Sequence, residues 1–214
     1  MNDFAKARVR MVQEQLLTRE INDQGVLAAM TRVPRHLFVE EALQAQAYGD
    51  FPLPIGEGQT ISQPYIVAVM TQMLALKGHE KTLEIGTGCG YQTAILAQLC
   101  EKVYSLERIK KLLARARNNL ATVGCFNALC KAGDGTLGWS EEAPFDAILV
   151  TAGGPEIPEA LIKQLADPGI LVIPVGDRNS QQLTRVIKND GKLSVEAGEM
   201  VRFVSLIGAQ GWQT

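Results

Sequence analysis

The sequence predicts a doubly wound α/β fold with a mostly parallel, Rossmann-like sheet, because short apolar runs alternate with helical patterns from residue 81 onward. Apolar runs of this kind are typical of parallel strands that helices cover on both faces. Three glycines between the first run and the next helix indicate a ligand-binding turn. An Asn-Asp-Gly turn between the last two runs indicates an antiparallel edge.

The first 60 residues are expected to form helices and a covering loop. An amphipathic helix is predicted over 4–17, and Asn22 or Asp23 is expected to cap a second helix that ends before Pro34. Residues 48–58 contain two prolines and three glycines, which predicts a loop. We expect the N-terminal helices to lie over the carboxyl ends of the parallel strands, where ligands bind in such folds.

The remaining elements follow in order along the chain. After a helix-like apolar run at 65–76, the expected parallel strands are 82–85, 103–106, 128–131, 147–151 and 170–174. The expected helices between them are 92–100, 109–123 and 158–166. Residues 182–188 and 193–207 are expected to pair around Asn189-Asp190-Gly191 as antiparallel strands. We therefore expect one domain over 1–214, with residues 1–60 as helices and covering loop and 61–214 as the core.

The composition favours a globular protein of the cytoplasm. The chain has 214 residues, of which 46% are hydrophobic, enough for one good core. A net charge of −2 gives no general attraction to nucleic acid or to an anionic membrane. No apolar run approaches the ~18 residues of a membrane-spanning helix, and the charged N-terminus lacks a signal-peptide core. We expect neither a nucleic-acid nor a membrane partner.

The cysteines and histidines do not predict a metal site. The four cysteines form no C-x-x-C pair, and the chain has only two histidines. We expect free thiols in a reducing compartment. The residues concerned are Cys89, Cys100, Cys125, Cys130, His36 and His79.

The stretch LEIGTGCGYQTAIL, residues 83–96, predicts a cofactor site. Gly86, Gly88 and Gly90 would make a tight turn between a strand and a helix, and they allow a ligand to lie directly on the backbone. The spacing is G-x-G-x-G, and Tyr91 occupies the place of the last glycine in a dinucleotide fingerprint. The spacing therefore favours a nucleoside ligand without phosphates, such as S-adenosylmethionine.

Three acidic residues bear on the same site. Glu107 ends the second strand, about 20 residues past the first glycine, where a carboxylate accepts ribose hydroxyls. Asp134 ends the third strand and either accepts a hydrogen bond from an adenine amino group or stabilises the turn before Gly135. Glu84 lies inside the first strand, where it either contacts the ligand or ties down neighbouring loops.

The loop GQTISQPYIV, residues 58–67, carries hydroxyl and amide side chains but none that could act as a base or nucleophile. Ser62 precedes a proline and an apolar run, which is typical of a helix N-cap. The same hydroxyl could contact a substrate or cofactor at the helix N-terminus. The sequence leaves both roles open, and Gln59 and Gln63 are read as exposed amides.

Seven stretches together resemble one family over nearly the whole chain. They are VPRHLFV (33–39), AYGDFPLPIGEGQTISQPYIVAVMT (47–71), LEIGTGCGYQTAILA (83–97), YSLER (104–108), GDGTLGW (133–139), APFDAILVTAG (143–153) and LVIPVG (171–176). The family is protein-L-isoaspartate (D-aspartate) O-methyltransferase. The resemblance implies an S-adenosylmethionine-dependent enzyme that methylates the α-carboxylate of isoaspartyl residues in damaged peptides and proteins. The ester then collapses to a succinimide, which can reopen to aspartate.

The resemblance also implies roles for particular residues. Those implied to bind the cofactor are Gly86, Gly88, Glu107, Asp134 and Gly135, and we add Glu84 as a cofactor-binding candidate because of its place in the first strand. Thr60 and Ser62 would lie between cofactor and substrate, with Ser62 as the active residue. Those implied to bind substrate are Ile61, Val201, Arg202 and Phe203. The chain departs from the family pattern at Ser205, where proline is usual, and at Pro168, where glycine is common.

Two rival functions are also compatible with the sequence. One is an S-adenosylmethionine-binding protein without activity, and another is a methyltransferase for another small molecule. The charge and the lack of an Asn-Pro-Pro-Tyr-like motif disfavour a nucleic-acid methyltransferase, and the glycine spacing disfavours a dehydrogenase. We expect a monomer, because diverse peptide substrates need an open groove.

Overall fold

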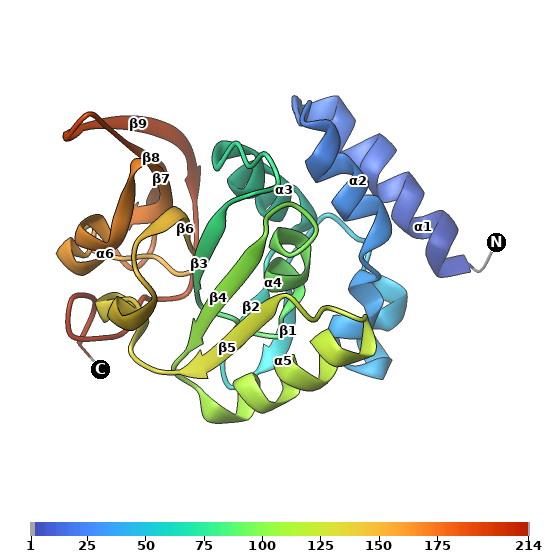
Figure 1. Ribbon diagram of the computed structural model, residues 1–214. Helices are drawn as coiled ribbons and strands as arrows, with labels where there is room; N and C mark the ends of the chain where they lie inside the picture. Colours follow the sequence, from blue (N-terminus) through green and yellow to red (C-terminus); the bar gives the residue numbers. More distant parts are fainter. Residues whose placement is uncertain (1–2, 214) are drawn as a thin grey trace.

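The computed structural model describes residues 3–213 and is built on a seven-stranded sheet with the order β5-β4-β3-β6-β7-β8-β9 (Figure 1). The parallel strands are β3 (Lys81–Ile85), β4 (Lys102–Glu107), β5 (Ala128–Ala132), β6 (Phe145–Val150) and β7 (Leu165–Gly176). The chain builds outward from β3 to β5 and then returns to the other side of β3. This arrangement confirms the doubly wound fold and puts its topological switch point between β3 and β6.

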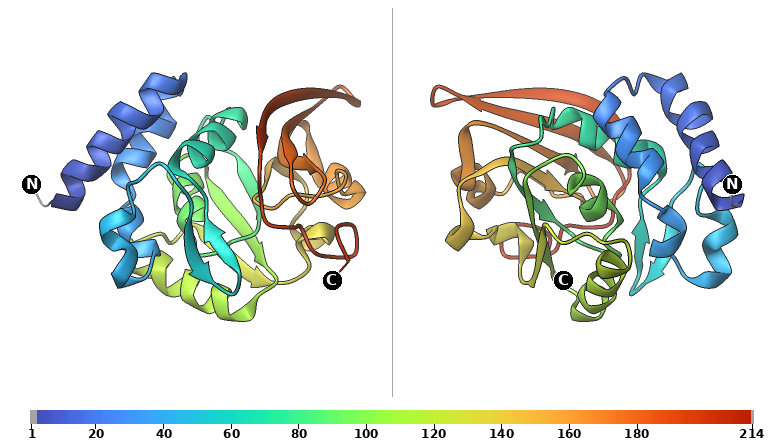
Figure 2. Two further views of the ribbon diagram at one scale, coloured as in Figure 1. Left: turned by 180° about the vertical axis from the view of Figure 1, so that it is seen from behind. Right: turned by 45° about the vertical axis from the view of Figure 1, so that its right-hand side comes forward.

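The antiparallel edge consists of β8 (Gln181–Asn189) and β9 (Lys192–Val201), whose hairpin projects from the rest of the molecule (Figure 2). Asn189 pairs with Lys192, and Asp190 and Gly191 between them have φ values of 50° and 72°. Two positive φ values are the signature of a primed hairpin turn, so the Asn-Asp-Gly prediction is confirmed. The predicted strand 193–207 is too long, because the chain leaves the sheet after Val201.

Helices cover both faces of the sheet, as predicted. On one face lie α3 (Pro64–Met73), α4 (Tyr91–Leu96) and α5 (Lys110–Thr122), and on the other lies α6 (Glu159–Gln164). Because side chains alternate along a strand, Ala147 and Leu149 of β6 pack with the α3 face. Their neighbours Ile148 and Val150 pack with the α6 face.

The N-terminal helices match the predicted positions along the chain. α1 (Asp3–Met11) continues through a π-helical segment, Val12–Leu16, and a short 3₁₀ turn, Leu17–Arg19. α2 (Gln24–Arg32) begins after Asp23, whose carboxylate accepts a hydrogen bond from the amide of Val26 at 3.0 Å. Of the two predicted caps, Asp23 is the one the structure uses. Two further 3₁₀ segments, Arg35–Phe38 and Glu41–Gln46, follow.

The N-terminal helices do not take the predicted place over the strand ends. α2 contacts α3 and α4, so α1 and α2 add an outer layer to that face of the sheet (Figure 1). The strand ends are instead reached by a hairpin of β1 (Leu53–Gly56) and β2 (Gln59–Ile61), within and after the segment predicted as a loop. Leu53 and Ile55 are buried while Pro54 is exposed. Proline is tolerated in such an edge strand, so Pro54 does not prevent β1 from forming.

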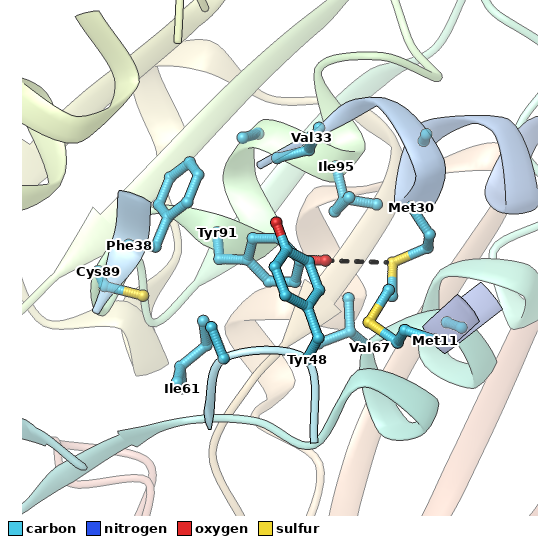
Figure 3. Close-up of a cluster of buried hydrophobic side chains, with 14 of the residues drawn as sticks. Met11, Met30, Val33, Phe38, Tyr48, Ile61, Val67, Cys89, Tyr91 and Ile95 are labelled. Atoms are coloured by element: carbon cyan, nitrogen blue, oxygen red, sulfur yellow. Dashed lines mark hydrogen bonds between the residues drawn. The ribbon is translucent and has the colours of Figure 1, made fainter. Parts of the chain in front are cut away.

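One apolar cluster joins the N-terminal segment to the sheet. It includes Met11 of α1, Met30 of α2, Tyr48, Ile61 of β2 and Tyr91 of α4 (Figure 3). The Tyr91 hydroxyl donates a hydrogen bond to the Met30 sulfur at 3.6 Å.

Within residues 3–213, no helix combines the length and the apolar character that crossing a membrane requires.

Candidate active site

A cavity of about 310 Å³ lies at the carboxyl ends of β3, β4 and β6, at the switch point where such folds bind ligands. We call it the main cavity, and its walls include Gly86, Gly88, Glu107, Arg108, Gly135 and Thr151. The β1–β2 hairpin closes one side with Ile55 and residues 58–60, and residues 204–207 close another. The volume lies at the lower end of the range for small-molecule sites.

Two glycines leave bare backbone in the wall of the main cavity. Gly86 has a φ of 99°, and a side-chain carbon there would collide with the hydroxyl of Thr151. A side-chain carbon at Gly135 would collide with Ile85. Both positions therefore require glycine, and a ligand can lie directly against the chain.

Glu107 lies at the same strand ends and is buried, with 6% of the residue exposed. Its Oε2 accepts a hydrogen bond from the Gly88 amide at 2.8 Å, and its Oε1 accepts one from the Ile109 amide at 2.9 Å. These bonds fix the carboxylate between the glycine turn and the start of α5. Each oxygen retains further acceptor capacity, because a carboxylate has about four lone-pair sites.

Glu84 lies beneath this site, fully buried, and its side chain does not line the main cavity. Its Oε2 accepts hydrogen bonds from the hydroxyls of Thr93 in α4 and Ser105 in β4, each at 2.5 Å. The pKa of Glu84 is raised from 4.5 to about 7. Burial is the largest cause; the hydrogen bonds from Ser105 and Thr93 oppose it, and the charge of Glu107 adds to it. Of the two roles left open by the sequence, these contacts are those of a residue that ties α4 to the sheet.

Asp134 also lies outside the wall of the main cavity, although its neighbour Gly135 is part of that wall. Its Oδ1 accepts hydrogen bonds from the amide and hydroxyl of Thr136 at 2.9 and 2.7 Å, and its Oδ2 accepts one from the Ala209 amide at 2.8 Å. Burial raises the pKa of Asp134, but these hydrogen bonds outweigh burial and hold the pKa below its ordinary value. In this structure the carboxylate stabilises its own turn and holds the C-terminal segment.

Two further hollows meet the main cavity. The larger, which we call the groove, has about 590 Å³ and runs between Arg19, Ser62, Tyr65 and residues 199–204. The smaller, which we call the junction cavity, has about 50 Å³ and is lined by Thr60, Ser62, Gly86, Tyr91, Thr151 and Phe203, among others. Thr60 and Thr151 line all three spaces. The residues predicted for catalysis and substrate binding therefore lie together, with Val201, Arg202 and Phe203 in the groove and Ile61 at the junction cavity.

Ser62 does not cap α3, so that one of its two possible roles is wrong. The helix begins at Pro64 and Gln63 holds the cap position, where no side chain makes a capping hydrogen bond. The Ser62 hydroxyl has no hydrogen-bond partner within residues 3–213, and it lines both the groove and the junction cavity. Its backbone carbonyl accepts a hydrogen bond from Nη2 of Arg35 at 2.7 Å.

The two departures from the family pattern lie in different places. Ser205 lines the main cavity and bridges to Gly153, so it bears on the cofactor side more than on the groove. Pro168 lies near the start of β7, exposed, and lines none of the three spaces.

Three parts of the site were not assigned roles from the sequence. Thr151 follows β6 at the switch point and donates its hydroxyl to the carbonyl of Gly86 at 2.8 Å. Its place at the carboxyl end of a predicted strand was the sequence feature that could have identified it as a site residue. Residues 204–207 form part of the main cavity after a turn back from β9, which no local pattern indicates. Arg35 belongs to a motif that carried the resemblance, but its burial could not be read from the sequence.

The pattern of the protein-L-isoaspartate(D-aspartate) O-methyltransferase family matches residues 6–211. Over 214 residues the chain is 58% identical to Protein-L-isoaspartate O-methyltransferase 1 of Syntrophobacter fumaroxidans, covering 100% of both chains. It is 59% identical over 214 residues to the Trichlorobacter lovleyi protein of that name, covering 100% of this chain and 99% of the relative. A solved Plasmodium falciparum structure, assigned as a protein-L-isoaspartate O-methyltransferase in complex with S-adenosyl-L-homocysteine, superposes with a TM-score of 0.82 at 28% identity. The superposition covers 94% of this chain and 98% of that one.

The doubly wound sheet and the glycine-walled cavity at its switch point are those of an S-adenosylmethionine-dependent methyltransferase. Relatives more than half identical over the full chain narrow that class. The chain belongs to the protein-L-isoaspartate(D-aspartate) O-methyltransferase family. The residues present fit a nucleoside cofactor, because the wall is bare backbone at Gly86 and Gly135 and a carboxylate lies beside it at Glu107.

Proposed function

We propose that this protein transfers the methyl group of S-adenosylmethionine to the α-carboxylate of L-isoaspartyl residues in damaged peptides and proteins. The observation that carries the proposal is the chemistry of the junction cavity. Its titratable side chains, among the described residues, are Cys89 and Tyr91. Burial raises the pKa of Cys89, and it raises the pKa of Tyr91 to about 12. Neither group can serve as a base near neutral pH.

A carboxylate acceptor explains why a site without a base is sufficient. With a reference pKa of about 3.5–4, the acceptor is already ionised near pH 7. Bound S-adenosylmethionine would supply a methyl group on a positively charged sulfur. The protein then has only to align the acceptor oxygen with that methyl group and exclude water. Alignment of this kind can be worth on the order of 7–11 kcal/mol.

Each part of the site would contribute to that alignment. Gly86, Gly88 and Gly135 would hold the cofactor against bare backbone, and Glu107 would accept the ribose hydroxyls. Glu84 and Asp134 were predicted to bind the cofactor, but neither lines the main cavity, so we propose that they support the cofactor site through α4 and the C-terminal segment instead. These assignments rest on the walls of the main cavity and on the hydrogen bonds of the two supporting acids.

On the substrate side, Thr60 and Ser62 would orient the carboxylate through their hydroxyls. The peptide would lie in the groove against Val201, Arg202 and Phe203, while Ile61, which is buried at the junction cavity, would fix the loop that carries the two hydroxyls. A loop of neutral donors orients a carboxylate without the strong cationic binding that would reduce its nucleophilicity.

We also propose that the chain is one domain, acts as a monomer and works in the cytoplasm. The one-domain proposal is supported by the apolar cluster that contains residues from both 1–60 and 61–214. The monomer proposal is supported by the need of diverse peptides for an open groove. The cytoplasmic proposal is supported by four free cysteines, three of them buried. Light scattering of the purified protein tests the monomer.

The deciding experiment supplies labelled S-adenosylmethionine with two peptides that differ only in an isoaspartyl or an aspartyl linkage. We expect base-labile label on the isoaspartyl peptide alone. A D-aspartyl version of the same peptide tests the second substrate of the family name. Binding of S-adenosyl-L-homocysteine without transfer to any peptide would contradict the proposal and favour a cofactor-binding protein without activity.

A further inference from the structure

Arg35 is a cation in the protein interior beside the proposed site. It is 0% exposed and follows α2 in a short 3₁₀ segment. Its Nε donates a hydrogen bond to the carbonyl of Ala47 at 2.7 Å, and its Nη2 donates one to the carbonyl of Ser62 at 2.7 Å. Its guanidinium carbon lies 4.9 Å from the centre of the Tyr91 ring. Within residues 3–213 no acidic side chain pairs with it.

This burial is not explained by stability alone. Removing a charge from water costs several kcal/mol, and well-packed apolar residues often replace buried ions without loss of stability. The remaining terminal nitrogen, Nη1, is buried without a hydrogen-bond partner among the described residues, which adds a further cost. A buried cation with no acidic partner and one unsatisfied donor calls for an explanation other than stability. We look for that explanation in the two carbonyls and the aromatic ring that Arg35 contacts.

The contacts of Arg35 connect two walls of the junction cavity. Ser62 belongs to the loop that would hold the substrate carboxylate, and Tyr91 is the first residue of α4, directly after the glycine turn. Tyr91 is held in turn by Phe38, whose ring meets it edge-on at 5.4 Å between centres, and by Met30 (Figure 3). Arg35 itself lines none of the three spaces.

We propose that Arg35 is a positioning residue, whose guanidinium fork fixes the Ser62 loop at a set distance from the glycine turn. The inference rests on the proposed methyl transfer. Arg35 acts through the Ser62 carbonyl and the Tyr91 ring, and it touches neither substrate nor cofactor. Its effect is therefore on the alignment of acceptor oxygen and methyl group more than on the binding of either ligand.

The planar fork, rather than the charge, carries this role. A lysine at the same position keeps the positive charge, but its donors sit on one compact, freely rotating nitrogen, which does not hold two carbonyls in the fixed geometry of a planar guanidinium. Arg35→Lys and Arg35→Met are therefore expected to behave alike. If the charge attracted the substrate carboxylate through space, Arg35→Lys would retain activity and Arg35→Met alone would lose it.

The test compares both variants with Arg32→Met as a matched control. Arg32 lies at the end of α2, exposed, and its guanidinium binds Gln98 instead of the Ser62 loop. For each protein, calorimetric titration with S-adenosyl-L-homocysteine gives the concentration of competent sites and the dissociation constant. Turnover on the isoaspartyl peptide is then expressed per competent site, so that a loss of folded protein does not appear as a loss of kcat.

For Arg35→Lys and Arg35→Met, we expect kcat per competent site to fall roughly 10- to 100-fold, the size of effect that a displacement of about 1 Å produces. The peptide KM and the dissociation constant of S-adenosyl-L-homocysteine should change less than kcat, and Arg32→Met should match the unaltered protein. Unchanged kcat per competent site would overturn the proposal, and so would activity retained by Arg35→Lys alone. Failure of both variants to bind S-adenosyl-L-homocysteine would also overturn the proposal, because Arg35 would then be required for the fold as a whole. Absence of transfer by the unaltered protein would instead contradict the proposed function.

Discussion

The buried carboxyl of Glu84 should make the stability of the protein depend on pH. Burial raises its pKa from 4.5 to about 7, mainly because the charged form is desolvated. The native state therefore holds a proton that the unfolded chain has already released between these two values. Stability from this group is fully present below pH 4.5 and is lost as the pH rises toward 7. At about 1.36 kcal/mol per pKa unit, the loss is about 3 kcal/mol.

Glu84→Gln isolates this effect, because the amide has the shape of the protonated carboxyl and its oxygen can still accept from Thr93 and Ser105. Urea unfolding of both proteins at several pH values between 4.5 and 7.5 gives the measurement. We expect the variant to gain about 3 kcal/mol relative to the unaltered protein across that window. Binding of S-adenosyl-L-homocysteine checks that the variant folds. Parallel stability curves for the two proteins would refute the reasoning.

Three further substitutions test individual residues. Ser62→Ala should lower kcat on the isoaspartyl peptide while leaving the unfolding free energy nearly unchanged, because its hydroxyl caps no helix; unaltered turnover would remove its proposed role. Glu107→Ala should raise the calorimetric dissociation constant of S-adenosyl-L-homocysteine at least about tenfold, since a charged hydrogen bond is worth about 1.5–3 kcal/mol, and an unchanged constant would count against the ribose contact. Asp134→Asn should speed hydrogen exchange at the Ala209 amide, whose acceptor is replaced by a donor; exchange at the native rate would show that the C-terminal segment is held without it.

The sequence predicted those features that depend on local pattern or on residue chemistry. The parallel strands, the glycine turn and the Asp190-Gly191 hairpin follow from periodicity and from backbone preferences, which act over a few residues. The roles of Glu84 and Asp134 were left between alternatives, because hydrogen-bond partners such as Thr93 and Ala209 are brought near only by the fold. The prediction that Ser62 caps α3 was wrong for a related reason. A Ser-x-Pro pattern indicates that a helix begins nearby but does not identify the cap residue, which is Gln63 in the structure.

The small volume of the junction cavity limits which carboxylates can reach the methyl group. A space of about 50 Å³ has room for a few atoms, so the main chain of a peptide in the groove stays outside and only a branch enters. In an isoaspartyl residue the α-carboxylate is attached directly to a main-chain carbon, whereas in aspartate a methylene group separates the carboxylate from the main chain. In the proposed arrangement, with the peptide backbone in the groove lined by Phe203 and Thr151, the two isomers would present the same functional group at different depths. If the proposed site is correct, discrimination between damaged and normal residues would depend on branch length, set by how far the groove lies from the glycine turn.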